Sequence, residues 1–394
     1  MTERELFFLY LGLPSHQPLG LEIDHAEGIY LYDVSGKKYL DLVSGISVSN
    51  LGHRHPAVIR AIEDQLKKYL HLNVYGEFIQ TPQVKLAQRL VSVLPDNLNS
   101  VYLVNSGSEA IEGAMKLAKR YTGRTEVVAF HNAYHGSTQG ALSILGNETL
   151  KNAFRPLIPD IRFLQFNNLK DLEKISEKTD CVVAETIQAE AGIILPENEF
   201  LETLSARCKE TGTLLIIDDV QMGFGRTGKL FSFEHFNFVP DILVLAKAMG
   251  GGMPVGAFIA SKAIMETLAF HPELGHITTF GGHPVCCAAA LASLEVLLGE
   301  SLIFQAEKKG AILSGFIQSH PMVKEIRRKG LILGIEIRDA GKRNKLTEAM
   351  LKNGIIIDWF LFHPSTFRIA PPLTITEEEC RFAGELLIKS MNEA

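Results

Sequence analysis

A lysine at the end of an apolar stretch is the first residue of the sequence whose position suggests chemistry. In DILVLAKAMGGGMPVG, residues 241–256, Lys247 follows a largely apolar run and precedes three glycines. A lysine at the end of a buried strand loses hydration, which lowers its pKa and makes its amine a nucleophile toward an aldehyde. A lysine at such a place can equally extend its amine into water, and that alternative stays open for Lys247 taken alone.

Two adjacent aspartates, Asp218 and Asp219, close another apolar run in TLLIIDD, residues 213–219. Successive side chains of a strand point to opposite faces, so at most one of the two faces inward. A buried carboxylate requires a cation or strong hydrogen-bond donors, and the apolar run places Asp218 close to the core. A helix cap or a pair at the surface is the alternative for both residues.

Small and aromatic residues follow two further apolar runs. NSGSEA, residues 105–110, leads into an expected helix, where Ser106, Gly107 and Ser108 could bind a phosphate at the helix N-terminus. A simple cap by Ser108 is the alternative. HNAYHGS, residues 131–137, offers Tyr134 or His135 as a ring that stacks on a planar cofactor, or else as a packed loop aromatic. Its histidines lack the carboxylate or cysteine neighbours of a metal site, so no metal is expected.

Together the four features match the requirements of one cofactor. Pyridoxal phosphate requires a lysine that reacts with its aldehyde, an aspartate beside its ring nitrogen, a phosphate site and a side chain stacked on its ring. Lys247, Asp218, NSGSEA and either Tyr134 or His135 would supply these groups. The combination therefore predicts a pyridoxal-phosphate enzyme, although each motif by itself has a structural explanation.

These residues require a sheet that brings the ends of several strands together. Helices are expected at 57–70 and 81–94, and short β-branched strands at 100–104, 126–130, 181–187, 213–218, 241–246 and 256–260. Strands that alternate with helices predict an α/β domain with a mainly parallel sheet. Ligands of such sheets bind outside the carboxyl ends of the strands, so the polar residues after the strands should meet there.

The two ends of the chain are expected to form a smaller domain. GIYLYDVSGKKYLDL, residues 28–42, alternates apolar and polar residues around Ser35-Gly36, which predicts a β-hairpin. After about residue 295 the pattern indicates a smaller α+β unit with strands at 331–337 and 354–360. We therefore expect residues 56–295 to form the large domain, residues 296–394 to form the small domain, and residues 1–55 to contribute to the latter.

Several classes of partner are disfavoured by the composition. The chain has 394 residues, 46% of them hydrophobic, and a net charge of −6 without a long basic run, which disfavours nucleic acid and anionic membranes. No apolar run approaches the roughly 20 residues that span a bilayer, and the N-terminus lacks the pattern of a signal peptide. Five cysteines, an odd number, fit reduced thiols in the cytoplasm.

Nine motifs, in order along nearly the whole chain, resemble those of the class III pyridoxal-phosphate aminotransferases, the group of ornithine, acetylornithine and 4-aminobutyrate aminotransferases. The motifs are GIYLYDVSGKKYLDL, NLGHRHP, NSGSEA, YHGS, AETIQAEAG, DDVQMGFGRTG, LAKAMGGGMPVGA, TTFGGHP and FRIAPPL. The resemblance implies the type I fold of pyridoxal-phosphate-dependent transferases, an α/β fold with a large domain around a mainly parallel sheet and a smaller α+β domain. It also implies an obligate homodimer with shared active sites.

The resemblance implies roles for individual residues. Lys247 would form a Schiff base with the cofactor and move the proton between substrate and cofactor, and Asp218 would pair with the ring nitrogen. The other residues placed at the cofactor are Ser106, Gly107 and Ser108 at the phosphate, Val220 and Tyr134 on the two ring faces, Gln221 at the ring hydroxyl, Glu185 as a support, and Thr279 at the phosphate of the neighbouring subunit.

Substrate choice is expected to depend on three positions. Arg368 in FRIAPPL resembles the arginine that binds the α-carboxylate of 2-oxoglutarate, and Glu190 in QAEAG the glutamate that neutralises it while an ω-amine donor is bound. Ser137 stands where the ornithine, acetylornithine and aminobutyrate enzymes have an arginine for a distal carboxylate, and a serine cannot replace that charged fork. Further departures from the family pattern are Ala189, Asp219 and His283.

The expected activity is a ping-pong transfer of an ω-amino group to 2-oxoglutarate. An aminomutase or racemase of the same fold is one alternative, and a lysine- or diamine-type ω-transaminase is another. Glu190 and Arg368 favour transfer, because an aminomutase needs no dicarboxylate acceptor. A non-enzymatic binding protein that retains the fold would be expected to lack Lys247 or Asp218, and both are present.

Overall fold

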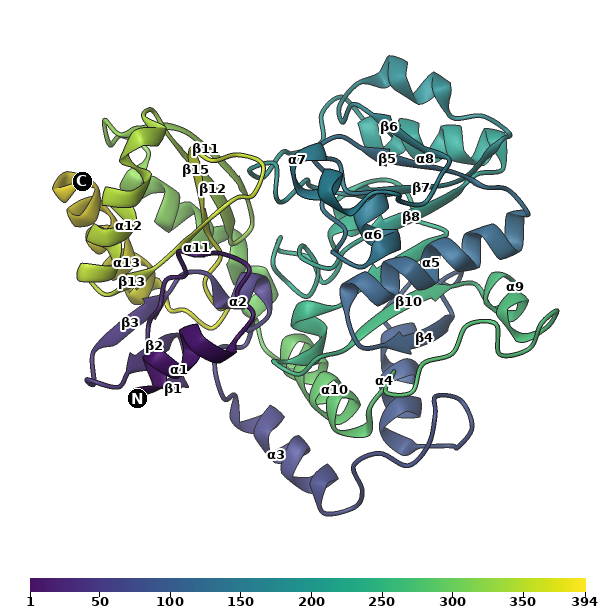
Figure 1. The fold of residues 1–394 in the computed structure, drawn as a ribbon, viewed down its shortest axis with the longest axis horizontal. Helices are drawn as coiled ribbons and strands as arrows, with labels where there is room; N and C mark the ends of the chain where they lie inside the picture. The colour runs from purple at the N-terminus through teal and green to yellow at the C-terminus, as the bar shows by residue number, and fades with distance from the viewer.

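A seven-stranded sheet forms the centre of one lobe of the protein (Figure 1). The structure is a computed structural model that describes all 394 residues. The strands of this sheet, in spatial order, are β4 (Ser100–Val104), β10 (Gly256–Ala260), β9 (Ile242–Leu245), β8 (Leu214–Asp218), β7 (Thr179–Glu185), β5 (Glu126–Phe130) and β6 (Ile161–Leu164). Only β10 runs antiparallel to its neighbours. The prediction of a mainly parallel sheet is confirmed.

Both faces of the large sheet are covered, which explains the continuous apolar runs of its strands. Along β5, Val128 and Phe130 pack into one hydrophobic cluster, whereas Val127 and Ala129 pack into a second cluster on the other face. The second cluster includes Ala110, Ile111 and Ala114 of helix α5 (Gly107–Thr122). The period-two alternation of a strand thus divides its side chains between two cores.

Two four-stranded sheets lie in the other lobe, which also contains both chain termini (Figure 1). The first sheet consists of β1 (Ile23–Glu27), β2 (Tyr30–Asp33), β3 (Lys38–Asp41) and β13 (Ile355–Ile356). The second consists of β11 (Val323–Lys329), β12 (Ile332–Ile337), β15 (Thr366–Ile369) and β14 (Asp358–Trp359). The predicted hairpin at 28–42 is confirmed by the antiparallel pairing of β2 with β3.

The predicted single strand at 354–360 is wrong, because this segment is shared between the two small sheets. Ile355 and Ile356 pair in parallel with β3, whereas Asp358 and Trp359 pair antiparallel with β15. The run GIIIDWF, apolar apart from Asp358, carries no signal of such a change of sheet. The change has a consequence for the site, since it places Asp358 directly opposite Arg368.

Helices α3 (Pro56–Leu66) and α4 (Thr81–Val91) confirm the two expected helices, although both end a few residues early. The remaining helices are α1 (Glu3–Tyr10), α2 (Ser44–Ser47), α6 (Gln139–Ser143), α7 (Glu148–Lys151), α8 (Phe200–Thr211), α9 (Lys262–Met265), α10 (Pro284–Gly299), α11 (Leu302–Ile317), α12 (Arg343–Lys352) and α13 (Glu377–Glu393). No single helix is long and apolar enough to cross a membrane, and α10 with α11, bent by 73°, passes that test only as a pair. The domain boundaries near residues 55 and 295 stay predictions.

Candidate active site

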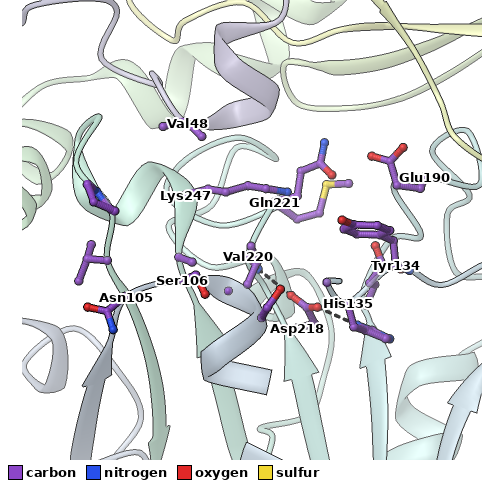
Figure 2. Close-up of a pocket in the computed structure, with 18 of the residues that line it drawn as sticks. Val48, Asn105, Ser106, Tyr134, His135, Glu190, Asp218, Val220, Gln221 and Lys247 are labelled. Carbon is purple, nitrogen blue, oxygen red and sulfur yellow. Dashed lines mark hydrogen bonds and ion pairs between the residues drawn. The ribbon is translucent and has the colours of Figure 1, made fainter. Parts of the chain in front are cut away.

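A cavity of about 440 Å³ opens where the strands of the large sheet end. Glu185 ends β7, Asp218 ends β8, and Lys247 follows β9 by two residues. Twenty residues line the cavity, and eleven of them are predicted site residues: Ser106, Gly107, Ser108, Tyr134, His135, Glu185, Glu190, Asp218, Val220, Gln221 and Lys247 (Figure 2). The parallel strands have therefore brought together residues that are up to 141 positions apart in the chain (247 − 106).

Lys247 is the first residue of a short 3₁₀ turn that extends to Gly250. Its φ of 47° lies in the left-handed region, which is uncommon for a residue with a side chain and concentrates at functional sites. Burial, and then the positive charge of Arg368, lower the pKa of Lys247. The lower pKa makes the neutral, nucleophilic form of the amine easier to reach near neutral pH.

Asp218 is held by a neighbour on each of its carboxylate oxygens. The Oδ2 atom lies 2.7 Å from Nδ1 of His135, and Oδ1 accepts a hydrogen bond from the backbone N–H of Val220 at 3.1 Å (Figure 2). Burial alone would lower the pKa of His135, but the hydrogen bond and charge of Asp218 raise it above its ordinary value. His135 thus supplies a hydrogen-bond partner to the buried carboxylate of Asp218 at the cavity wall.

The two aromatic candidates of HNAYHGS therefore have different positions. The ring of His135 is buried beside Asp218, while Tyr134 lies at the cavity near Glu190 (Figure 2). The hydroxyl of Tyr134 lies 3.2 Å from Oγ of Ser137. The side chain of His135 has no exposed surface, whereas the ring of Tyr134 is partly exposed at the cavity, which favours Tyr134 for stacking.

Glu185 connects the two loops that border this part of the cavity. Its Oε2 accepts a hydrogen bond from the N–H of Tyr134 at 3.3 Å, and its Oε1 accepts one from the N–H of Ala189 at 3.0 Å. Burial raises the pKa of Glu185 to about 7, against the opposing charge of His135. Glu185 thus fixes Tyr134 and the residue before Glu190 relative to the sheet.

An anion site is formed where the loop after β4 enters α5. Ser106 is the N-cap and accepts the N–H of Glu109 at 3.2 Å, so the alternative of a cap by Ser108 is wrong. The N–H groups of Gly107 and Ser108 begin a helix of 16 residues and have no acceptor within it. A Cβ atom on Gly107 would lie 3.1 Å from Val220, so the glycine allows the close approach of Val220 to the helix terminus.

Arg368 lies outside the cavity lining, fully buried behind Glu190. Its Nη2 donates to Oε1 of Glu190, its Nη1 donates to Oδ2 of Asp358 at 3.1 Å, and the guanidinium lies 4.4 Å from the ring centre of Phe360. Glu190 itself lines the cavity. The predicted pair of Glu190 and Arg368 is therefore in contact, with the glutamate between the arginine and the open volume.

Two other predicted residues do not line the cavity. Ser137 is exposed, and its N–H donates to Oγ of Ser108 at 3.3 Å. Thr279 is exposed in the segment before α10. Their predicted roles toward a substrate and toward a neighbouring subunit stay predictions.

Comparison with known proteins decides the family. Residues 12–391 match the family described as aminotransferase class III. The chain is a class III aminotransferase. It is 38% identical to an acetylornithine aminotransferase of Methanopyrus kandleri over 96% of either chain, and 40% identical to a [LysW]-aminoadipate semialdehyde/glutamate semialdehyde transaminase of Sulfolobus acidocaldarius over 93% of this chain and 94% of the other.

Solved structures of transaminases superpose closely on this class III aminotransferase. An ornithine aminotransferase from Toxoplasma gondii is 29% identical, with a TM-score of 0.91 over 100% of this chain and 96% of that chain. An acetylornithine aminotransferase from Elizabethkingia anophelis is 32% identical, with a TM-score of 0.86 over 99% and 98% of the two chains. The fold is thus that of the pyridoxal-phosphate-dependent aminotransferases, and the protein is a transaminase.

The class III aminotransferases depend on pyridoxal phosphate, and the cavity has the donors that this group requires. Nε2 of Gln221 is buried without a hydrogen-bond partner, although Gln221 lines the cavity. The cavity also presents the N-terminus of α5 for a phosphate, a fixed carboxylate at Asp218 and a lysine of lowered pKa. The orphaned amide, the anion site and the lysine together fit the cofactor.

Nine lining residues were missed by the sequence reasoning: Val48, Asn105, Gly136, Met222, Ala246, Gly252, Met253, Pro254 and Val255. Five of them flank Lys247, and the run MGGGMPVG signals a loop that lies close to a ligand. Val48 comes from the N-terminal segment, more than 50 residues before the first strand of the large sheet. Nothing near Val48 in the sequence marks its approach to the cavity.

Proposed function

We propose that this class III aminotransferase binds pyridoxal phosphate in the cavity through Lys247, Asp218 and the N-terminus of α5, and that it transfers an ω-amino group to 2-oxoglutarate by a ping-pong cycle. The observation that carries this proposal is the ion pair of Glu190 and Arg368 beside Lys247. Val220, Gln221, Glu185 and Tyr134 would hold the ring of the cofactor. Ser106, Gly107 and Ser108 would hold its phosphate.

The chain's own groups have defined tasks in such a cycle. Bound pyridoxal phosphate supplies an aldehyde that accepts the amino group and a ring that withdraws electrons from the reacting carbon. Nζ of Lys247, with its lowered pKa, takes the proton from the substrate carbon and returns it. Asp218, held by His135, would lie against the ring nitrogen and favour its protonated form. Glu185 holds Tyr134 in place at the cavity.

The acceptor is proposed to be a 2-oxo dicarboxylate because a buried arginine lies one side chain away from the cavity. A guanidinium forms two parallel hydrogen bonds to a carboxylate, which gives both affinity and orientation. Glu190 neutralises Arg368 while an uncharged part of an amine donor occupies the pocket. When Glu190 turns away, Arg368 can bind the α-carboxylate of 2-oxoglutarate. One pocket can then serve the two half-reactions.

The donor is proposed to be an ω-amine whose distal end is not bound by an arginine. Ser137, which stands at the usual position of that arginine, is bonded through its hydroxyl to Tyr134. The relatives are named for acetylornithine, an ω-amine, and for the semialdehydes of [LysW]-aminoadipate and of glutamate, which are the aldehyde side of such a transfer. A diamine or a bulkier ω-amine without a distal carboxylate fits the serine better than free ornithine does, and a lysine-like amino acid, whose carboxylate needs another partner, stays an alternative.

An obligate homodimer and a cytoplasmic location complete the proposal. Thr279 is exposed, as expected of a residue that reaches the phosphate site of a second copy. All five cysteines are free and buried, which accords with a reducing compartment. Mass measurement of the native protein tests the dimer.

A panel of amine donors tests the proposed reaction. Cofactor-loaded protein is mixed with each donor in the absence of an acceptor, and its near-visible absorbance band is followed; 2-oxoglutarate or pyruvate is then added. We expect an ω-amine to remove the band and 2-oxoglutarate, but not pyruvate, to restore it. Lys247→Ala should lack the band from the start. Isomerisation of a single substrate without any acceptor would instead indicate an aminomutase or racemase.

A further inference from the structure

Two carboxylates accept hydrogen bonds from Arg368, and the sequence predicted only one of them. Nη2 of the arginine donates to Glu190, and Nη1 donates to Asp358 at 3.1 Å. The two acids belong to different elements: Glu190 follows β7, and Asp358 lies in β14. The guanidinium itself is fully buried, and its Nε has no hydrogen-bond partner.

The two carboxylates differ in their freedom to leave the arginine. Glu190 lines the cavity, so rotation of its side chain can move the carboxylate into open volume once its Oε2 also leaves the N–H of Leu361, which donates to it at 3.1 Å. Asp358 does not line the cavity, and its backbone pairs directly with that of Arg368 across β14 and β15. Phe360, in the same segment as Asp358, covers one face of the guanidinium at 4.4 Å. Glu190 is therefore the partner that can turn into the cavity, whereas Asp358, 28% exposed and with no hydrogen-bond partner on Oδ1, is kept beside Arg368 by the pairing of β14 with β15.

The charged groups around Arg368 determine how strongly the arginine attracts the carboxylate of a substrate. Burial raises the pKa of Asp358 to about 6, with Arg368 opposing and Glu190 and Asp41 reinforcing the rise, so the group is ionised at pH 8. With both acids in place, Arg368 is over-neutralised. When Glu190 turns away, one positive and one negative charge remain. Coulomb attraction is strong at a buried site, so the remaining Asp358 weakens the attraction for a substrate carboxylate.

We infer that Asp358 is a specificity-determining residue: it stays on Arg368 when Glu190 leaves, and its charge sets a moderate affinity for the dicarboxylate acceptor. The free Nη2 and Nε edge of the guanidinium is then left for the substrate, while Nη1 stays engaged. A weaker hold on the carboxylate also lets the amino-acid product leave and the amine donor enter. This inference rests on the proposed role of Arg368 as the acceptor site.

Binding of glutarate, a non-reacting dicarboxylate of five carbons, tests the inference. The cofactor-loaded protein is titrated with glutarate at pH 8 by calorimetry. Asp358→Asn removes the charge but keeps an oxygen that accepts the hydrogen bond from Nη1. We expect this variant to bind glutarate about threefold to tenfold more tightly than the original protein, because a net positive charge now meets the ligand. The KM for 2-oxoglutarate should fall similarly, with the KM for the amine donor unchanged.

Matched variants separate the possible results. Glu325→Gln removes a carboxylate of the same sheet that contacts Arg327 instead, and it should leave glutarate binding unchanged. Asp358→Ser, smaller and uncharged, should also bind glutarate more tightly. This variant replaces Asp358→Asn in the titration if the asparagine variant unfolds. Weaker or unchanged glutarate binding in folded Asp358→Asn overturns the inference. If Arg368→Gln leaves glutarate binding intact, the acceptor site lies elsewhere, and the proposed function fails together with the inference.

Discussion

Asp219 is a buried carboxylate without a cation, next to Asp218 in the sequence. It is fully buried and accepts hydrogen bonds from the N–H of Ser232 at 2.8 Å and from the hydroxyl of Ser232. Burial raises the pKa of Asp219 to about 8 in spite of these two bonds. The folded protein therefore holds Asp219 protonated at neutral pH, whereas the unfolded chain ionises it near the ordinary value.

This difference predicts a pH-dependent stability that Asp219→Asn removes. For an acid whose folded pKa is raised, the contribution to stability is complete below the unfolded pKa of 3.8 and is lost as pH rises toward about 8. The slope approaches about 1.4 kcal/mol per pH unit within that window. Asparagine can accept from the N–H of Ser232 and, once the hydroxyl of Ser232 rotates to accept, donate to it as the O–H of the protonated acid would.

Denaturant midpoints of both proteins between pH 5 and pH 8 provide the measurement. We expect the midpoint of Asp219→Asn to rise progressively relative to the original protein as the pH increases. Asp96→Asn, at an exposed position, should keep a constant difference. A difference that does not change with pH for Asp219→Asn would show that Asp219 is ionised in the folded protein.

Single residues of the cavity could be located from the sequence where a strand end marks them. Lys247 and Asp218 could be found because each closes an apolar run, and the family motifs supplied Glu190 and Arg368. The partners of these residues could not be found in this way. The sequence does not show whether Tyr134 or His135 contacts Asp218. In the structure the contact is made by Nδ1 of His135. Asp358 stands in an apolar run whose change of sheet leaves no trace in the composition.

At the scale of elements, the cavity depends on a close approach between α5 and the loop after β5. Gly136 has a φ of 128°, and a Cβ atom there would lie 2.0 Å from Oγ of Ser108. The same loop carries Tyr134 and His135, and Ser108 belongs to the proposed phosphate site. The glycine thus fixes the distance between the ring-binding and phosphate-binding parts of the cavity.

Gly136→Ala should therefore separate these two parts. Both the left-handed φ and the contact with Ser108 oppose a methyl group, so the loop must move. We expect the affinity for pyridoxal phosphate to fall by about tenfold or more, a loss of roughly 1.4 kcal/mol. A fluorescence titration of cofactor-free protein measures this affinity. Gly315→Ala in α11, where a Cβ atom meets nothing within 4 Å, should bind the cofactor normally; an equal affinity in Gly136→Ala would refute the argument.

Helices and strands with a clear hydrophobic pattern could be predicted from the sequence, and those without such a pattern could not. The parallel strands were recognisable because burial on both faces makes them continuously apolar. Strand β11 has the sequence VKEIRRK, with five charged residues, and its position at the edge of a sheet leaves it without a hydrophobic pattern. The pairing of β3 with β13 joins residues more than 300 positions apart, which no local pattern records.

On the scale of the whole molecule, one buried arginine connects the three segments that the sequence divides into two domains. Arg226 follows β8 in the large lobe and has no exposed surface. Its guanidinium donates to the carbonyl oxygens of Leu331 at 3.0 Å and Pro371 at 2.6 Å, in the C-terminal part. It also donates to Oγ of Ser44 and Oδ1 of Asn50, in the N-terminal segment.

Arg226→Lys should loosen all three connections at once. A lysine keeps the charge, but its single ammonium group cannot reach four acceptors that lie around a planar fork. Hydrogen bonds from a charged donor contribute about 1.5–3 kcal/mol each to the free energy of unfolding. Buried acceptors that lose their donor lower the stability further. We expect the thermal midpoint to fall by about 5 °C or more. Arg328→Lys, whose arginine contacts the exposed Glu307, should shift the midpoint little. If the thermal midpoints of both variants equal that of the original protein, Arg226 does not hold the lobes to one another.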